Sequence, residues 1–346
     1  MHSFFKDIGA TIPLIQAPMA GAQDEKLAIA VAQKGAAGSI ACARLNPDKI
    51  VDSVERFRHH TSGPLNLNFF CHTIVPRDPH RERLWLDQLR PYYTELNLAT
   101  DYPTDATLFA IDDALADSVC ALKPEIASFH FGLPSQRIVN RIRATGAKII
   151  ATATTLKEAQ YLQDQGCDAI IAQGCEAGGH QGIFVPDATV DPLTLMDLVT
   201  QCVSTLTIPV IAAGGIADAH AVRLAMGAGA AGTQIGTRFL KTPESTITPL
   251  HRSILEGSDN RETAITNVFT GRPARGFVNK LVQEVGPINP NAQAFPLAIS
   301  AVAPIGKATQ GSEDFVAMWA GTNWQIGQAK AAADVVDDLK SGFVTD

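Results

Sequence analysis

Short runs of aliphatic and β-branched residues recur along this chain, and most are followed by a segment whose apolar residues have helical spacing. This alternation predicts βα units on a parallel sheet, because parallel strands are buried on both faces and appear as continuous apolar runs. We predict eight strands, at residues 12–17, 36–41, 65–70, 126–131, 148–153, 169–173, 208–213 and 230–235. Helices are predicted at 25–34, 47–59, 107–122, 135–145, 155–165, 192–204 and 217–226.

Eight βα units are the number that closes a TIM (β/α)8 barrel, so the predicted fold class is α/β. Two segments interrupt the regular spacing. Residues 71–105 hold a helix bounded by prolines, which we interpret as an excursion from the barrel. Residues 242–310, rich in proline, predict a small, mostly helical cap or substrate subdomain after the eighth strand. The barrel then comprises 1–241 and 311–346, with closing helices expected at 312–321 and 328–342.

Composition narrows the class of protein. The 346 residues are 46% apolar and 18% charged, which is typical of a globular chain and not of a disordered one. A net charge of -7 without a basic block argues against nucleic acid as a partner. Six scattered cysteines without a CxxC pair indicate reduced thiols. With no export signal and no apolar run of about 18 residues, we expect a soluble, cytoplasmic protein without membrane contact.

Glycines follow the last two predicted strands. Functional residues of a barrel lie at the C-terminal ends of its strands, and the loops after strands seven and eight often bind phosphate. Gly214, Gly215, Gly236 and Thr237 occupy these loops, where backbone N–H groups can approach a phosphate closely. The alternative is that these glycines only form tight turns. No GxGxxG follows the first strand, so a Rossmann dinucleotide site is not expected.

A histidine follows the sixth predicted strand in a glycine-rich loop. Gly178 and Gly179 allow this loop to fold over a ligand and to present His180, which can accept a proton near neutral pH. The alternative is a histidine that only bonds the loop. His130, at the end of the fourth strand, is a second candidate for the mouth of the barrel, and could equally be a polar lining residue.

Small and amide side chains follow other strands. Ala17, Pro18 and Met19 form a compact turn, which brings backbone amides close to a flat ligand. Asn68 and Gln173 can each donate and accept a hydrogen bond, as the edge of an isoalloxazine ring requires. Together with the phosphate loops, these residues outline a planar phosphorylated ligand such as FMN, although the spacing also fits other phosphorylated ligands. No metal-ligand spacing such as HExxH is present, so no metal is expected.

Five segments, QAPMAG, SFHFGLP, GCEAGGHQG, AAGGIAD and GTQIGTRFL, together resemble the nitronate monooxygenase family, over nearly the whole barrel. The AGGH loop is similar to that of related FMN barrels, including flavin-type enoyl-acyl carrier protein reductases and NADH:quinone reductases. The HFGLP segment, Lys307 and the late MWAG favour the nitronate branch.

The resemblance implies non-covalent FMN and the oxidation of alkyl nitronates such as propionate 3-nitronate by O2, through a flavin semiquinone, to a carbonyl compound and nitrite. It implies that His180 removes the α-proton of neutral nitroalkanes and that Lys307 is a basic residue near the flavin. We expect Lys307 and His130 to bind the substrate. The flavin positions it implies are Ala17, Pro18, Met19, Asn68, Gln173, Gly178, Gly179, Gly214, Gly215, Gly236 and Thr237. Phe295 stands where we expect a tyrosine before Pro-Leu, so a substrate-side hydroxyl is missing.

Other functions remain open at the level of sequence. The nearest is an FMN-dependent reductase in which NAD(P)H reduces the flavin and a quinone or enoyl thioester reoxidises it. A second is a non-catalytic barrel that binds a phosphorylated ligand. The expected partners are the nitronate or nitroalkane and O2, and a homodimer is left open.

Overall fold

The computed structural model describes residues 1–73, 75–100, 108–185, 192–309 and 312–343. Its main sheet confirms the eight predicted strands, all parallel, in the order β1-β9-β8-β6-β5-β4-β3-β2. The strands are β1 (Leu14–Gln16), β2 (Gly38–Ala41), β3 (Leu65–Phe70), β4 (Ile126–His130), β5 (Lys148–Ala153), β6 (Ala169–Gln173), β8 (Val210–Ala213) and β9 (Gly232–Ile235). Three of them have the predicted bounds, and the other five are one to three residues shorter.

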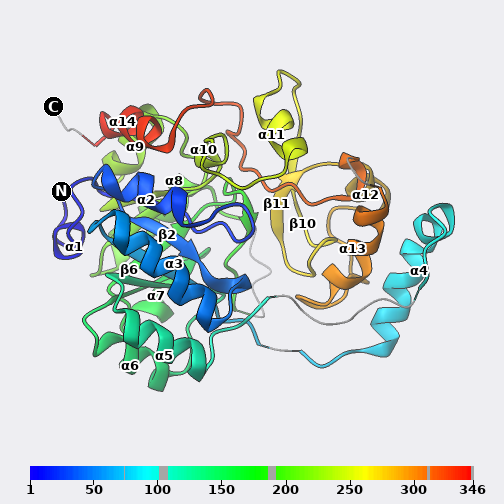
Figure 1. The fold of residues 1–346 in the computed structure, drawn as a ribbon, viewed down its shortest axis with the longest axis horizontal. Coiled ribbons are helices and arrows are strands. Elements are labelled where there is room, and N and C mark those ends of the chain that lie inside the picture. The colour runs from blue at the N-terminus through cyan, green and yellow to red at the C-terminus, as the bar shows by residue number, and fades with distance from the viewer. Residues whose placement is uncertain (74, 101–107, 186–191, 310–311, 344–346) are drawn as a thin grey trace.

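The two end strands of the sheet, β1 and β2, meet through a single bridge. Ile15 pairs with Ala37, and the Gln16 N–H donates to the Ala37 carbonyl at 2.9 Å. The Ala37 N–H donates in turn to the Leu14 carbonyl, also at 2.9 Å. The sheet is therefore a nearly closed, TIM-like barrel, seen in Figure 1 with its helices around it.

The predicted helices form outside the strands, and polar caps fix most of their starts. The helices are α2 (Glu25–Gln33), α3 (Pro47–His60), α5 (Asp113–Leu122), α6 (Gln136–Arg143), α7 (Leu156–Asp164), α8 (Leu195–Thr205) and α9 (Ala219–Gly227). In α3, the Asn46 side chain accepts from the Lys49 N–H, and in α5 Asp112 accepts from Leu115. The predicted start of α5 at residue 107 lies outside the described residues, but the prediction is wrong for 108–112, which are not helical because Ala110 pairs with Phe70 of β3.

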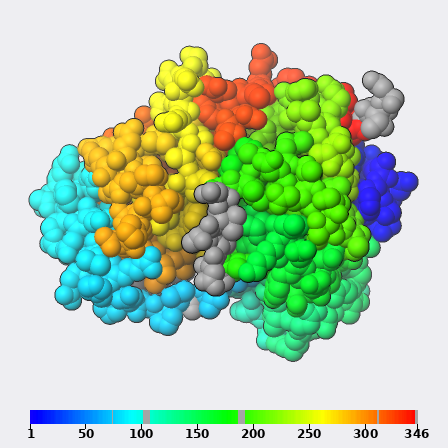
Figure 2. Space-filling model, turned by 180° about the vertical axis from the view of Figure 1, so that it is seen from behind, coloured from blue at the N-terminus to red at the C-terminus, as the bar shows by residue number. Residues whose placement is uncertain are grey.

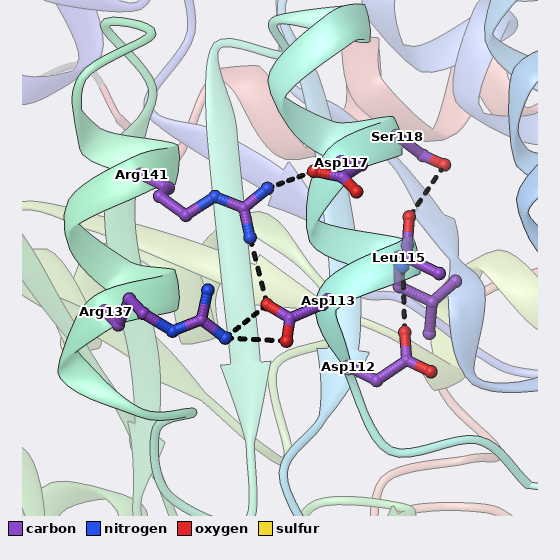
Figure 3. A network of polar contacts seen from close by, with 8 residues as sticks. Asp112, Asp113, Leu115, Asp117, Ser118, Arg137 and Arg141 are labelled. Carbon is purple, nitrogen blue, oxygen red and sulfur yellow. Dashed lines mark hydrogen bonds and ion pairs between the residues drawn. The ribbon is translucent and has the colours of Figure 1, made fainter.

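Exposed ion pairs join two of these outer helices. Arg137 of α6 donates to both oxygens of Asp113 on α5, at 2.5 and 2.6 Å. Arg141, one turn later, donates to Asp113 at 3.0 Å and also pairs with Asp117 (Figure 3). Exposed pairs of this kind contribute little to stability, so the contact between the helices depends mainly on their buried apolar faces.

A short N-terminal helix that the sequence did not predict, α1 (Ser3–Asp7), closes the bottom of the barrel. Phe4 and Phe5 are buried among side chains of the barrel interior. The Phe5 ring lies so close to Gly232 of β9 that a Cβ there would come within 2.4 Å of it. Glycine at this position is therefore required by the packing of Phe5.

A smaller antiparallel sheet lies beside the barrel. It contains β10 (Thr263–Thr266), β11 (Ala274–Phe277) and the two-residue β7 (Gly179–His180), which comes from the loop after β6. Around it are α10 (Thr237–Leu240), α11 (Pro249–Glu256), α12 (Lys280–Val285) and α13 (Ala298–Ala308). The segment predicted as mostly helical thus also contributes two strands. That it forms a separate subdomain is still a prediction.

Helix α4 (Pro79–Glu95), in the segment predicted as an excursion, packs on α13 and away from the barrel wall. The Tyr93 hydroxyl donates to the Ala301 carbonyl at 2.7 Å, and Tyr92 donates to Glu284 at 2.5 Å. Figures 1 and 2 show this helix beside α12 and α13, at the end of the molecule farthest from α1. Residues distant in sequence therefore share a second apolar cluster.

The prediction of a closing helix at 312–321 is wrong. The chain there forms only a single 3-10 turn, η2 (Glu313–Phe315), and then runs extended along β11. The Phe277 N–H donates to the Met318 carbonyl at 3.0 Å, and Gly276 pairs with Trp319. This pairing with β11 overrides the helical spacing of the apolar residues. The second closing helix is confirmed as α14 (Ala332–Lys340), whereas the predicted boundary at 310 and 311 lies outside the described residues.

Within the described ranges, no helix is both long enough and apolar enough to cross a membrane.

Candidate active site

A cavity of about 940 Å³ opens at the C-terminal ends of the barrel strands. All of the residues predicted for the site line it: Ala17, Pro18, Met19, Asn68, His130, Gln173, Gly178, Gly179, His180, Gly214, Gly215, Gly236, Thr237 and Lys307. The described lining contains no aspartate or glutamate, but it does contain two cations, Lys307 and Arg44. The cavity is thus suited to an anionic ligand.

Glutamine side chains hold the loop after β1. The Gln16 amide nitrogen donates to the Gln23 side-chain oxygen at 2.7 Å, and that oxygen also accepts from the Met19 N–H at 2.8 Å. The Gln16 amide oxygen accepts from the Ser39 N–H at 3.0 Å. Because Gln16 is fully buried, these bonds fix the turn Ala17–Met19 against the first two strands.

Asn68, near the end of β3, uses one of its two polar side-chain atoms in a hydrogen bond to the neighbouring strand. Its amide nitrogen donates to the Ser128 hydroxyl at 2.9 Å. Its amide oxygen has no hydrogen-bond partner among the described residues, and the side chain lines the cavity. Asn68 can therefore accept a hydrogen bond from a ligand.

The loops after β8 and β9 carry the glycines that the sequence predicts to bind a phosphate. Gly214 and Gly215 have φ of +116° and +66°, which favours glycine, and a Cβ on Gly215 would lie 3.1 Å from that of Glu176. A Cβ on Gly236 would lie 3.4 Å from the Cβ of Ala17. Within the described chain, the N–H groups of Gly215, Gly236 and Thr237 have no acceptor. Free donors on glycine-rich loops fit a phosphate.

The backbone of His180 is held by one neighbouring strand and two side chains. β7 pairs with β11, with His180 opposite Ala274. The His180 carbonyl accepts from the Gln173 amide nitrogen at 3.0 Å and from His130 Nε2 at 3.2 Å. The Gln173 amide oxygen accepts from the Gly182 N–H at 2.8 Å. Gln173 and His130 line the cavity, but the Gln173 amide and Nε2 of His130 are bonded to this loop.

The tautomer of His130 follows from these contacts. A carbonyl can only accept, so Nε2 of His130 must carry the proton that it donates to the His180 carbonyl. Burial, with Arg272 adding to the effect, lowers the pKa of His130 to about 4, so the ring is neutral at pH 7 and Nδ1 carries a lone pair that can accept a hydrogen bond. The Thr152 hydroxyl, 3.1 Å away, donates to that nitrogen.

The imidazole of His180 lies among aromatic rings. The centroids of Phe295, Trp319, Phe131 and Phe70 are 5.4, 5.6, 5.9 and 6.2 Å from its own. Burial, reinforced by the neighbouring His130 and by the Arg272 guanidinium, lowers the pKa of His180 to about 3. The ring is therefore neutral at pH 7, with a lone pair on one of its two nitrogens.

Phe295 occupies the position where a tyrosine was expected. Its side chain is buried and packs on the rings of His180 and of His72, whose centroid is 4.9 Å away. The Arg272 guanidinium lies 5.7 Å from the Phe295 centroid and 4.3 Å from that of Phe131. The side chain at position 295, packed on the ring of His180, is thus apolar and carries no hydroxyl.

Three residues near His180 were not predicted. Thr270 bonds its ring, and Arg272 reaches the loop after it through a 2.7 Å bond to the Ile183 carbonyl. Arg44, exposed after β2, lines the cavity. Thr270 and Arg272 lie just before β11, outside the barrel strands, so the rule that functional residues follow barrel strands does not find them. Arg44 follows a predicted strand and could have been considered.

Comparisons with known proteins agree with this geometry. A family model described as nitronate monooxygenase matches residues 2–342. The nitronate monooxygenase of Pseudomonas aeruginosa is 35% identical over 345 residues, covering 97% of each chain. That of Paraburkholderia phytofirmans is also 35% identical, covering 96% of this chain and 92% of its own length.

Solved structures have the same fold. The structure described as a nitroalkane oxidase from Streptomyces ansochromogenes matches with a TM-score of 0.87 at 32% identity, covering 97% of this chain and 96% of that chain. FabK from Thermotoga maritima matches with a TM-score of 0.74 at 23% identity, covering 99% and 96%, a similarity of fold alone.

Proposed function

The chain belongs to the nitronate monooxygenase family, and we propose that its cavity binds FMN together with alkyl nitronates such as propionate 3-nitronate. The chain is thus a flavin-dependent nitronate monooxygenase, which oxidises its substrate with O2. The observation that carries the finer proposal is that every residue expected to contact flavin or substrate lines one cavity. The absence of carboxylates from its described lining supports an anionic substrate and a phosphorylated cofactor.

We assign the two ends of FMN to opposite loops of the barrel. The free N–H groups of Gly215, Gly236 and Thr237 would hold the phosphate. The free amide oxygen of Asn68 would accept a hydrogen bond from the edge of the isoalloxazine. Gly179 has open space on its Cβ side, which leaves room for the ring beside His180. When bound, FMN supplies the electron transfer between nitronate and O2.

The protein's own groups bind the substrate and move one proton. Lys307 forms no ion pair with a described residue, and its ammonium is free to attract the nitronate. The neutral His180 ring accepts the α-proton when the substrate is a neutral nitroalkane. His130 holds the His180 carbonyl and forms part of the substrate wall. Residues 242–310 act as a cap, since α13 and the 267–272 turn supply the wall opposite the barrel.

An absorbance spectrum of the purified protein, followed by separate anaerobic additions of ethylnitronate and NADH, tests this function. We expect flavin bands that change on addition of ethylnitronate and not on addition of NADH, with nitrite formed once O2 is admitted. Bleaching by NADH alone would instead identify a reductase, and a colourless folded protein that rejects FMN would identify a barrel without redox chemistry.

The variant His180→Asn separates proton abstraction from oxidation. We expect a loss of about 100-fold or more in kcat/KM for neutral nitroethane, within the range that general-base catalysis contributes. Oxidation of ethylnitronate and binding of FMN should change little, because a nitronate arrives already deprotonated. Equal losses for both substrates would show that His180 is not the base.

A further inference from the structure

The ring of His180 has one hydrogen-bond partner among the described residues. Its Nε2 lies 3.0 Å from the Thr270 hydroxyl oxygen. Nδ1 forms no hydrogen bond with a described residue and is not among the buried atoms that lack a partner. Since His180 lines the cavity, Nδ1 is the nitrogen open to the cavity.

The other contacts of Thr270 determine which atom carries the hydroxyl proton. The hydroxyl oxygen lies 3.3 Å from the Arg272 carbonyl and 3.4 Å from the Arg272 N–H. A hydroxyl has one hydrogen and two lone pairs, a carbonyl only accepts, and a backbone N–H only donates. All three contacts are satisfied together only when Thr270 donates to the Arg272 carbonyl and accepts from the Arg272 N–H and from His180 Nε2–H. Donation to Nε2 would leave the carbonyl contact without a hydrogen.

The turn that carries Thr270 is fixed on both sides. Gly271 has φ of +90°, and a Cβ there would lie 2.1 Å from the Gln293 carbonyl oxygen. Arg272 packs on Phe131 and donates to the Ile183 carbonyl. β11 begins two residues later and pairs with His180 itself. One segment therefore holds both the backbone and the ring of His180.

We infer that Thr270 fixes His180 in the tautomer with its proton on Nε2, so that the Nδ1 lone pair faces the cavity as the proton acceptor. This inference rests on the proposed role of His180 as base and identifies the residue that prepares it. Thr270 is a positioning residue, because it acts through the ring. In the opposite tautomer Nδ1 would carry a proton and could not accept one.

The assigned tautomer accounts for a complete proton transfer. In a neutral nitroalkane the Cα–H bond breaks, its electron pair stays on the substrate as the nitronate, and the proton forms a new bond to Nδ1. The ring then carries two N–H groups, and Nε2–H keeps its bond to Thr270. No ring rotation and no second proton transfer are needed, and the nitronate balances the new positive charge.

The kinetic test compares Thr270→Val with Thr270→Ser in the holoenzyme. Valine preserves the shape without the hydroxyl, and we expect kcat/KM for nitroethane to fall about tenfold or more relative to that for ethylnitronate, the effect of losing one such bond. Thr270→Ser should restore the wild-type ratio of kcat/KM for nitroethane to kcat/KM for ethylnitronate. Thr266→Val is the matched control, because Thr266 is buried on β10 and, among the residues that the structure describes, its hydroxyl accepts only from the Val268 N–H, at 3.3 Å. Its ratio should equal that of the wild type.

A spectroscopic test does not depend on turnover. In holoenzyme labelled with 15N-histidine, the His180 ring signals are those lost in His180→Asn. We expect them to show a protonated Nε2 and a bare Nδ1 in the wild type, and a mixture of tautomers in Thr270→Val. If Thr270→Val loses its flavin absorbance, the wild-type spectrum alone decides.

Two outcomes overturn the inference: a protonated Nδ1 in the wild type, or an unchanged substrate ratio in a flavin-loaded Thr270→Val. They differ from failure of the proposed function. If His180→Asn impairs both substrates equally, the base itself is wrongly assigned. If His180→Asn lowers activity with nitroethane alone and Thr270→Val does not, only the role of Thr270 is rejected.

Discussion

Replacing the buried His251 should reduce the acid sensitivity of the fold. His251 lies on α11 with 8% of its surface exposed, edge-on to Phe277, with a ring-centroid distance of 6.2 Å. Its Nε2 is buried and has no partner among the described residues. Burial, with a smaller effect of Arg252, lowers the pKa of His251 from 6.5 to about 4, although the Trp319 carbonyl acts in the opposite direction.

The sign and size of the effect follow from proton linkage. The unfolded chain binds the proton with a pKa near 6.5 and the folded chain only near 4, so the free energy of unfolding decreases as the pH falls between these values. At pH 5 the unfolded histidine is mostly protonated and the folded one mostly neutral. The difference is worth about 2 kcal/mol relative to pH 8 for this one side chain.

Urea unfolding at pH 8 and pH 5, at a fixed saturating FMN concentration, measures this difference. The wild type should lose stability between the two values, and His251→Leu should lose about 2 kcal/mol less. His220→Leu is the control, because His220 is exposed on α9 and its substitution removes no buried ring. An identical loss in the wild type and His251→Leu would refute the reasoning, since His251 would then be able to charge within the folded protein.

Two further substitutions test the turns around the cavity. Gly271→Ala should lower the free energy of unfolding by at least about 2 kcal/mol, because φ is +90° and the new Cβ would meet the Gln293 carbonyl at 2.1 Å; unchanged thermal melting would contradict the described turn. Gly215→Ala should raise the Kd for FMN about tenfold, by straining a loop at φ +66° and displacing its N–H groups, measured by quenching of flavin fluorescence. An unaltered Kd would place the phosphate elsewhere.

The barrel could be predicted because its strands are buried on both faces. The run at Lys148–Ala153, for example, is apolar except for Lys148 and Thr152 and is followed by a capped helix, so local pattern and tertiary structure agree. The segment 312–321 failed for the opposite reason. Its apolar spacing fits a helix, but its backbone pairs with β11, and no local signal reports that pairing.

The residues of the site likewise include some that the sequence could indicate and some that it could not. Residues at strand ends, such as His180 and Gly215, could be located because the barrel brings those ends together. The uses of Gln173 and His130 could not be predicted, since their bonds to the His180 carbonyl depend on how the loop folds back. Thr270 is 90 residues from its partner and precedes a strand of the smaller sheet, so neither spacing nor strand order indicates it.

The two bonds made by the Gln173 side chain have a consequence for how this chain can vary. They join the end of β6 to residues 180 and 182, which closes the intervening loop into a ring of defined length. Side chains alternate across a strand, so one inserted residue before β7 would turn the imidazole of His180 to the opposite face. Insertions should therefore accumulate in other connections, while the number of residues between Gln173 and Gly182 stays constant.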